Sequence, residues 1–449
     1  MSVLTSIDLF AGCGGLALGL HHAGFQLLFA LEKDPMAFET LEANLLSPNA
    51  PYQVADRWPS WLERGPHDIE AVLDDEAICA HLESLRGTVT LVCGGPPCQG
   101  FSVGGSRNGH DQRNRLPMRY LDFVNLVRPQ IILMENVEGM ARRFLSRPGE
   151  RATSVADWLR CELGQMGYEA EFRVIDASKF GVPQTRRRLI LFGVRRDSLY
   201  PWSGAGAFFE VLEAMAKPFV ASKGLSTDRP VTVREAIDDL NNSELIVCPD
   251  SPKFMAGTYK EPTSIYAQLM RRGITNDVPP NSHRFSYHGD RILDFYKKVQ
   301  ATQPFGRLPK SFLLECGTKK DKKVLIDPDA PASTITTHPD EFIHYSVPRN
   351  ISVREMARLQ SFPDDFEFKG RYTINGPRRR FDVARCSQVG NAVPPLLAEA
   401  LGQALVRFIS MTEMQRDTIA PDVRVEDVTP PMRDQLGLFS TILTAQGAK

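Results

Sequence analysis

The chain has 449 residues, of which 42% are hydrophobic, so it can bury sizeable cores and is long enough for two or three domains. Its formal net charge of −1 gives no overall support for nucleic-acid binding, although local basic clusters could contact phosphates as well as solvent. No apolar run approaches the length of a bilayer span, no two of the eight cysteines have Cys-x-x-Cys spacing, and the N-terminus lacks a signal-peptide layout. We therefore expect a cytoplasmic protein without a membrane segment, a disulfide framework or a metal site.

Strand and helix patterns alternate along the first half of the chain. Apolar runs predict strands at 6–10, 27–31, 89–93, 131–134, 168–175 and 188–194. Helical patterns are found at 16–23, 35–45, 74–85 and 154–166. This alternation is typical of an α/β fold, and the last two strands are candidates for antiparallel neighbours.

The pattern weakens after Trp202, where the chain becomes rich in Pro, Ser, Thr and charge, with isolated helix signals at 233–240 and 291–299. Helical order returns at 352–360 and 394–408. We therefore expect three parts: an α/β domain over 1–204 that is completed by 388–410, a smaller irregular domain over 205–387, and a flexible polar tail over 411–449.

The turn after the third strand is the most informative stretch, with the sequence Gly-Gly-Pro-Pro-Cys-Gln-Gly-Phe-Ser at 94–102. Its two prolines end the strand, because proline fixes φ and has no N–H to donate. Cys98 is thereby presented beyond the carboxyl end of a strand, where open α/β sheets bind ligands. Most free cysteines are buried and inert, but this Gly/Pro frame favours a nucleophile.

A glycine-rich turn at 11–15 follows the first strand, and Glu32 ends the second. The glycines allow a ligand to approach the backbone and the helix N-terminus, and Glu32 can accept hydrogen bonds from ribose hydroxyls. The Gly-x-Gly-Gly spacing differs from the dinucleotide fingerprint, and such turns also serve tight strand–helix packing. The acid nevertheless favours a nucleoside-containing cofactor.

Two further constellations face the same crevice if the sheet forms as expected. Glu135 ends the fourth strand, where it could donate a proton, or could instead serve a turn or helix cap. In the segment 184–188, strand alternation points Arg186 and Arg188 to one face and Arg187 to the other. Such arginines could hold a planar base or a phosphate, or form a solvated strand edge.

Six blocks together resemble the DNA cytosine-5 methyltransferase family and follow its order. They are Asp-Leu-Phe-Ala-Gly-Cys-Gly-Gly at 8–15, Pro-Pro-Cys-Gln-Gly-Phe-Ser at 96–102, Glu-Asn-Val at 135–137, Gln-Thr-Arg-Arg-Arg at 184–188, Arg-Glu-Met-Ala-Arg-Leu-Gln-Ser-Phe-Pro at 354–363 and Gln-Val-Gly-Asn at 388–391. The resemblance implies a Rossmann-like S-adenosylmethionine-dependent methyltransferase sheet with helices on both faces. It also implies a target-recognition domain in the variable stretch between the fourth and fifth blocks.

The same resemblance implies a reaction on double-stranded DNA that needs no metal. Cys98 would attack C6 of a cytosine flipped out of the duplex, and Glu135 would bind or protonate N3. C5 would then take the methyl group, while Arg186 and Arg188 hold the base and the region of the thiol.

For the cofactor, the resemblance places Phe10 against the adenine and Glu32 on the ribose of S-adenosylmethionine. Asp68 is expected at the adenine edge, with Asp75 as its rival. The full set of expected cofactor-binding residues is Phe10, Gly12, Cys13, Gly15, Glu32, Asp68, Ile69, Pro97, Leu116, Asn391 and Val393.

Two positions depart from the family pattern: Thr90 stands where many members have an acid, and Ala392 where serine is frequent. Neither change removes a reacting group, so we expect activity. The alternatives are a tRNA cytosine-5 methyltransferase, a non-catalytic DNA-binding relative and an NAD-dependent dehydrogenase. The Gly-Phe-Ser at 100–102 and the long middle segment favour DNA over tRNA, the intact reacting set argues against a non-catalytic relative, and the glycine spacing argues against NAD.

The tail contains a short apolar motif made of Gln435, Leu436, Leu438 and Phe439. It resembles the peptide that bacterial replication proteins insert into the sliding clamp, although these side chains could also pack back onto the body. We further expect a monomer on DNA in the bacterial cytosol or nucleoid, serving a restriction-modification or related phage-defence system.

Overall fold

The structure is a computed structural model that describes residues 3–55, 57–97, 115–142, 153–198, 204–318, 322–338, 340–373 and 382–418, with side chains up to 411. Its centre is a six-stranded sheet in the order β2-β1-β3-β4-β7-β5. The strands are β1 (Thr5–Leu9), β2 (Gln26–Leu31), β3 (Leu91–Gly94), β4 (Ile131–Val137), β5 (Tyr168–Asp176) and β7 (Arg187–Arg195). β1 to β4 pair in parallel, and β7 is antiparallel to both β4 and β5, as predicted for the last two strands.

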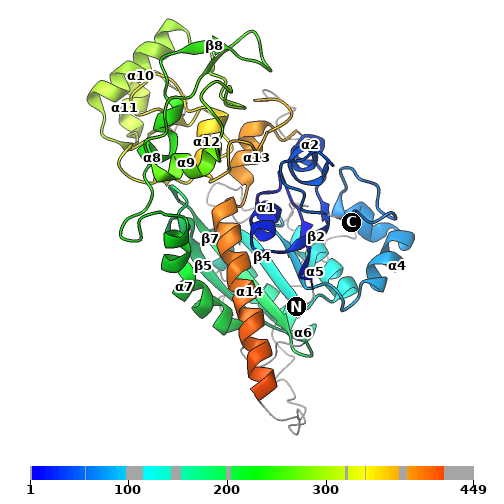
Figure 1. Cartoon of the computed structure of the whole chain (residues 1–449). Coiled ribbons are helices and arrows are strands. Elements are labelled where there is room, and N and C mark those ends of the chain that lie inside the picture. The colour runs from blue at the N-terminus through cyan, green and yellow to red at the C-terminus, as the bar shows by residue number, and fades with distance from the viewer. Residues whose placement is uncertain are drawn as a thin grey trace.

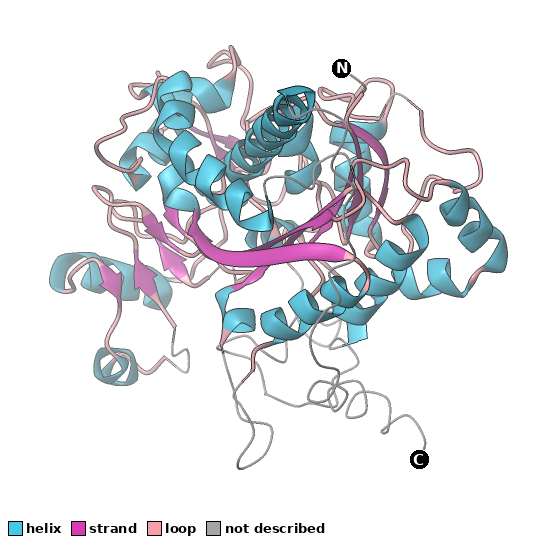
Figure 2. Cartoon of the chain, turned by 90° about the horizontal axis from the view of Figure 1, so that it is seen from below, coloured by secondary structure: helices cyan, strands magenta, loops and turns pink. Residues whose placement is uncertain are grey.

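Helices cover both faces of this sheet (Figure 2), because its strands are apolar on both sides. In β3, Leu91 and Cys93 join one core and Val92 joins the other. The first face carries α1 (Gly15–His22), α7 (Gly204–Ser222) and α14 (Pro395–Thr418). The second carries α3 (Ile69–Asp74), α4 (Glu76–Ser84), α5 (Leu116–Val127) and α6 (Val155–Gln165). The predicted fold class is confirmed.

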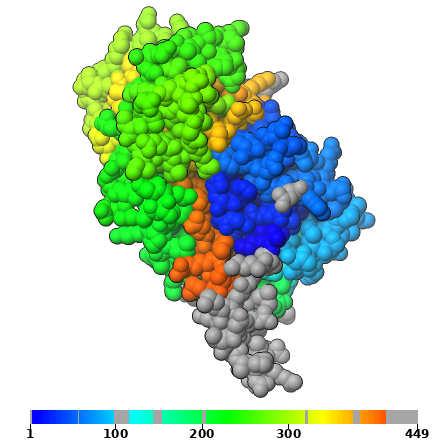
Figure 3. Space-filling view, in the orientation of Figure 1, coloured from blue at the N-terminus to red at the C-terminus, as the bar shows by residue number. Residues whose placement is uncertain are grey.

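The first and last parts of the chain meet on the first face. α1 packs along α14, so the dark blue N-terminal residues adjoin the orange C-terminal helix on the surface (Figure 3). α2 (Pro35–Leu41) continues through a π-helical turn at Glu42–Leu46 on the same side as α13 (Arg385–Asn391). The long-range pairing of α1 with α14 completes the sheet domain from its two ends.

A smaller part lies above the carboxyl end of the sheet (Figure 1). Its helices are α8 (Val233–Ile237), α9 (Ile265–Arg271), α10 (Asp290–Thr302), α11 (Lys310–Glu315) and α12 (Val353–Leu359). Its strands are β8 (Leu245–Val247), β9 (Met255–Gly257), β10 (Gly306–Arg307), β11 (Val324–Leu325) and β13 (Phe342–Ile343). β12 (Ala332–Ser333) pairs with β6 (Gln184–Thr185), which ties this part to the chain just before β7.

Several helices differ from the sequence prediction, among them the short helices α3, α9 and α11, which it did not include. α5 and α7 were not expected, and α13 occupies a stretch read as a loop. α7 contains Pro218 but buries Phe208, Phe209 and Leu212 against β5, β7 and α14, so tertiary packing outweighs its irregular pattern. We therefore propose that the sheet domain extends through α7, beyond the boundary expected at 204. α14 likewise continues past residue 411, where the tail was expected to begin.

One described helical stretch, Arg385–Met411, is long and apolar enough by composition to cross a membrane. Within its most apolar window, 78% of the residues are buried inside the fold. This is the behaviour of a core helix, and it agrees with the packing of α14 between α1 and α7.

Candidate active site

The cofactor turn, residues 10–15, leaves β1 with a backbone that favours glycine. φ is +58° at Gly12 and +94° at Gly14, which precedes the first residue of α1. A Cβ on Gly15 would collide with the backbone carbonyl oxygen of Val393, so only glycine allows this approach. The turn thereby contains four of the predicted cofactor residues, Phe10, Gly12, Cys13 and Gly15, and presents the free N–H groups of a helix N-terminus.

Glu32 is fixed against this turn at the end of β2. Its Oε2 accepts a hydrogen bond from the Gly12 N–H at 2.9 Å, and its Oε1 accepts one from the Asp34 N–H at 2.7 Å. Burial raises the pKa of Glu32 above its usual value. Each carboxylate oxygen can accept a second hydrogen bond, so the predicted contact with ribose hydroxyls is chemically available.

Asp68 lies close to Glu32 along the backbone. The N–H of His67, the residue before Asp68, donates to the Glu32 carbonyl at 2.7 Å. Asp68 caps α3 and forms an ion pair with Lys33 at 3.7 Å. Asp75 instead caps the separate helix α4. Of the two aspartates proposed for the adenine edge, the geometry therefore favours Asp68.

The remaining predicted cofactor residues approach from several elements. Cys13 is buried, and its thiol donates to the Gln388 carbonyl at 3.8 Å. Burial raises the pKa of Cys13 to about 12, which makes this thiol an unreactive packing group. Asn391 is exposed at the end of α13. Phe10, with φ of +59°, is half-buried, Ile69, Leu116 and Val393 are buried, and Pro97 is exposed.

Glu135 and Arg188 form an ion pair on neighbouring strands. Their Oε1 and Nε atoms lie 2.9 Å apart, and the two side chains are 11% and 12% exposed. Val137 lies opposite Arg188 in the β4–β7 register. Glu135, two residues before Val137, is on the same face of the sheet and is the diagonal neighbour of Arg188. The sequence placed Glu135 at the end of its strand, but β4 continues to Val137, so Glu135 lies inside the strand.

The turn that leads to Cys98 lies over this pair. The Asn136 side-chain amide donates to the Pro96 carbonyl at 2.7 Å, which fixes the turn to β4. A Cβ on Gly95 would lie 3.3 Å from both the backbone oxygen and Oε2 of Glu135. Cys98 itself lies outside the described residues, and Pro97 is the last described residue before it.

Arg186 has a different environment from the one expected. It is 1% exposed, and its guanidinium donates to the backbone carbonyls of Gly390 at 2.9 Å, Ala392 at 3.0 Å and Ile335 at 3.2 Å. Burial lowers the pKa of Arg186 well below its usual value, with Arg188 adding to the shift. Arg187 is 57% exposed and pairs with Glu138, so the predicted alternation of the three arginines is confirmed.

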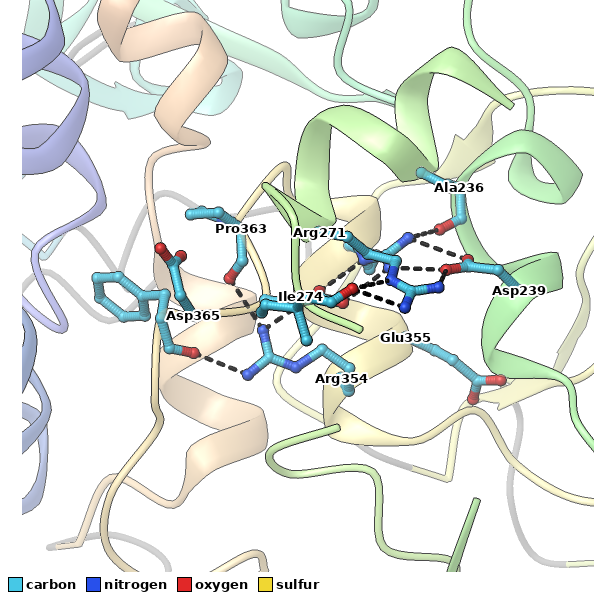
Figure 4. Close-up of polar contacts among 12 residues, drawn as sticks. Ala236, Asp239, Arg271, Ile274, Arg354, Glu355, Pro363 and Asp365 are labelled. Carbon is cyan, nitrogen blue, oxygen red and sulfur yellow. Dashed lines mark hydrogen bonds and ion pairs between the residues drawn. The ribbon is translucent and has the colours of Figure 1, made fainter. Parts of the chain in front are cut away.

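A buried ion-pair network fixes α12 inside the small part (Figure 4). Arg358 is fully buried and binds both Asp239, at 3.0 Å, and Asp364, at 2.6 Å. Arg354 donates to the carbonyls of Pro363 and Phe366. All seven residues of α12 are buried, so both arginines lie inside the fold and not on a solvated face.

Two buried histidines in this region predict a loss of stability in acid. Desolvation lowers the pKa of His283 to about 4 and that of His344 to about 3. Both are therefore neutral when folded, whereas the unfolded chain gains protons below about pH 6.5, so their stability contribution falls as the pH drops.

Asp8, whose pKa burial raises to about 7, acts in the opposite direction, so the histidine contribution must be isolated by substitution. We expect the stability difference between the wild type and His283→Gln to shrink by about 1 kcal/mol between pH 7 and 5.5. Urea unfolding at both pH values measures it, and a pH-independent difference contradicts the assignment.

Among the described residues there is no group of three or more His, Cys, Asp or Glu side chains that could hold a metal ion. The site consists instead of a glycine turn with Glu32 and a carboxyl–arginine pair. Such groups can bind a ligand, donate a proton and stabilise charge. They lie near the described turn that ends at Pro97, the residue before Cys98.

Comparisons with known proteins agree over nearly the whole chain. The family model described as C-5 cytosine-specific DNA methylase matches residues 4–407. Type II methyltransferase M.AgeI of Thalassovita gelatinovora is 31% identical over 91% of this chain and all of its own length. Type II methyltransferase M.DdeI of Desulfomicrobium norvegicum is 29% identical over 92% of this chain and 91% of its own.

A solved structure from an E. coli prophage, assigned as a DNA modification methyltransferase, has 24% identity. It covers 91% of this chain and 99% of its own with a TM-score of 0.62, which supports the fold. The matched residues of the family model reach both ends of the sheet domain and span the small part between them. The chain belongs to the C-5 cytosine-specific DNA methylase family.

Proposed function

We propose that this S-adenosylmethionine-dependent DNA methyltransferase modifies C5 of a cytosine flipped out of a specific duplex sequence, through a covalent adduct at Cys98. The observation that carries the proposal is the Glu135–Arg188 pair, held at 2.9 Å beneath the turn that leads into Cys98. The glycine turn with Glu32 lies at the carboxyl end of the same sheet.

The Cys98 thiolate bonds to C6, and the electron pair of the C5–C6 double bond moves toward N3, where Glu135 supplies a proton or hydrogen bond. Bound S-adenosylmethionine supplies the methyl group, which C5 takes as a nucleophile. With S-adenosylhomocysteine left behind, a solvent base takes the C5 proton, the C5–C6 double bond re-forms as the Cys98 sulfur leaves as a thiolate, and the N3 proton returns to Glu135, which restores the aromatic ring. Arg188 holds Glu135 through their ion pair, and its guanidinium can donate hydrogen bonds to the base edge.

The glycine turn and Glu32 together suit a nucleoside that carries a charged tail. Gly15 leaves no room for a Cβ, and the Glu32 carboxylate is fixed by two backbone N–H groups. We propose that Glu32 binds the ribose, Asp68 the adenine edge, and Phe10 the adenine face, with Asn391 and Val393 closing the pocket.

The substrate is tested by offering radiolabelled S-adenosylmethionine with duplex DNA or with tRNA. Label on DNA supports the proposal, and label on tRNA alone supports the tRNA methyltransferase instead.

Because each relative reported above is named a type II methyltransferase, we also propose a restriction-modification or related phage-defence role. Bisulfite sequencing of DNA from expressing cells should then show methylation confined to one recognition sequence.

Glu135→Gln should lower kcat about 100-fold, because the amide keeps the size of the side chain but cannot give N3 a proton. The affinity for S-adenosylhomocysteine should not change, since Glu135 lies on the base side of the site. Steady-state kinetics and calorimetry measure the two effects. Glu138→Gln, a 42% exposed carboxyl just after the same strand, is the matched control and should keep full activity. An unchanged kcat in Glu135→Gln would remove the proposed role.

We further propose that the enzyme acts as a monomer on DNA in the bacterial cytoplasm, and that the motif Gln435, Leu436, Leu438 and Phe439 docks to a sliding clamp. This motif lies outside the described residues. Light scattering measures the molar mass of the enzyme with and without a duplex, and both values should correspond to one copy of the chain. Fluorescence anisotropy with purified clamp tests docking, which Leu438→Ala with Phe439→Ala should abolish; equal binding by the double variant contradicts it.

A further inference from the structure

Gln360, the residue that follows α12, reaches from the small part into the cofactor side of the site. It is fully buried. Its Nε2 donates to the Val389 carbonyl at 2.7 Å and lies 3.5 Å from the Ala392 carbonyl, while its Oε1 accepts from the Gln184 amide at 3.0 Å. Val389 and Ala392 flank Asn391 in the chain.

The backbone of the segment 389–393 is held by hydrogen bonds and close contacts, although the Asn391 side chain is exposed. Arg186 donates to the Gly390 and Ala392 carbonyls. A Cβ on Gly390 would lie 2.5 Å from the Thr336 carbonyl oxygen, so the backbone is in direct contact there. The Val393 carbonyl in turn touches the position of Gly15 in the cofactor turn. A shift of this segment therefore changes the cofactor pocket directly.

The position of Gln360 is itself set by the small part. α12 is held by the buried ion pairs of Arg358 with Asp239 and Asp364. Directly after Gln360, the Ser361 hydroxyl accepts a hydrogen bond from the Leu396 N–H at 3.1 Å, at the start of α14. The end of α12 thus meets both the segment 389–393 and the helix that follows it.

We propose that Gln360 is a positioning residue for the cofactor: it holds the segment 389–393 against the cofactor turn, so that a residue of the small part sets the affinity for S-adenosylmethionine without touching it. This inference rests on the proposed function, because it assumes that Asn391 and Val393 contact the cofactor. Gln184 completes the arrangement by fixing the orientation of the Gln360 amide, since its own Nε2 also donates to the Leu359 carbonyl at 3.0 Å.

The test is Gln360→Met, which keeps the length and the packing of the side chain but removes its amide. We expect the Kd of S-adenosylhomocysteine, measured by calorimetry, and the KM of S-adenosylmethionine to rise about tenfold, because the segment 389–393 loses its hydrogen bonds from the Gln360 amide. The KM of duplex DNA and the kcat at saturating cofactor should stay within about twofold, a split that general destabilisation does not produce.

Gln300→Met is the matched control. The Gln300 amide also donates to two backbone carbonyls, those of His344 and Val347, but it lies within the small part and has no contact with 389–393 in the described structure. It should leave the Kd of S-adenosylhomocysteine unchanged. Equal weakening by both variants, or an unchanged Kd in Gln360→Met, overturns the inference.

Thermal unfolding shows whether each variant is folded. If Gln360→Met does not fold, Gln360→Glu is used in its place. The carboxylate keeps the shape of glutamine but turns an oxygen toward the Val389 carbonyl, so the Kd should again rise about tenfold or more. Wild-type enzyme that neither binds S-adenosylhomocysteine nor methylates DNA indicates a failure of the proposed function. Normal wild-type behaviour with normal Gln360 variants indicates a failure of this inference alone.

Discussion

Cys98→Ser should lower methyl transfer to duplex DNA by about 1000-fold or more, because a serine hydroxyl remains protonated near neutral pH and is a much weaker nucleophile than a thiolate. The affinity for S-adenosylhomocysteine should stay within about twofold of the wild type, since the proposed cofactor contacts come from the glycine turn and Glu32 and not from the thiol. Single-turnover transfer of radiolabelled methyl groups and calorimetry measure the two quantities.

Cys79→Ser serves as the control for loss of a thiol. The Cys79 side chain donates to the backbone carbonyls of Val72 and Leu73 in the α3–α4 region, and a hydroxyl can make the same bonds. This variant should methylate DNA at the wild-type rate. Appreciable transfer by Cys98→Ser would mean that the thiol is not the nucleophile.

Arg358→Leu should destabilise the fold by about 3–5 kcal/mol, because it removes the cation that binds two buried carboxylates. Asp239 and Asp364 are 3% and 4% exposed, so neither can be solvated after the loss. Urea unfolding followed by circular dichroism measures the free energy of unfolding, and the small part should lose its structure first.

The control is Arg234→Leu, which removes a bidentate pair with Asp329 at the surface of the same part. The two side chains are 50% and 71% exposed, so the change should cost less than about 1 kcal/mol. Similar costs for the two substitutions would show that the buried network is not what holds α12.

The sheet and its carboxyl edge could be predicted from the sequence, because the relevant signals are local. The inner strands are buried on both faces and read as apolar runs, and the turns after them carry Gly12 and Gly95 at positions that a larger residue would crowd or strain. Strand ends and strand alternation predicted that Glu135 and Arg188 face the same crevice, whereas their ion pair was not predicted.

The contacts of Arg186 and Gln360 could not be predicted in this way, because their partners are distant in the chain. Gln184 and Gln360 are 176 residues apart, and Arg186 binds carbonyls more than 200 residues further on. Every residue has a backbone carbonyl, so the residue types do not show which carbonyl an arginine will bind. In the sequence, an arginine that binds carbonyls therefore cannot be told from one that binds a base. α7 was missed for a similar reason, since its helical state depends on packing against β5, β7 and α14.

The covalent step at Cys98 is tested most directly with a duplex that contains 5-fluorocytosine within the recognition sequence found by bisulfite sequencing. Fluorine replaces the C5 hydrogen that must leave as a proton, so the enzyme should transfer the methyl group and then remain attached to the base. Mass spectrometry of the digested complex should locate the adduct on the peptide that contains Cys98, with one methyl group added to the base. Turnover without an adduct, or an adduct on another residue, would contradict the proposed mechanism.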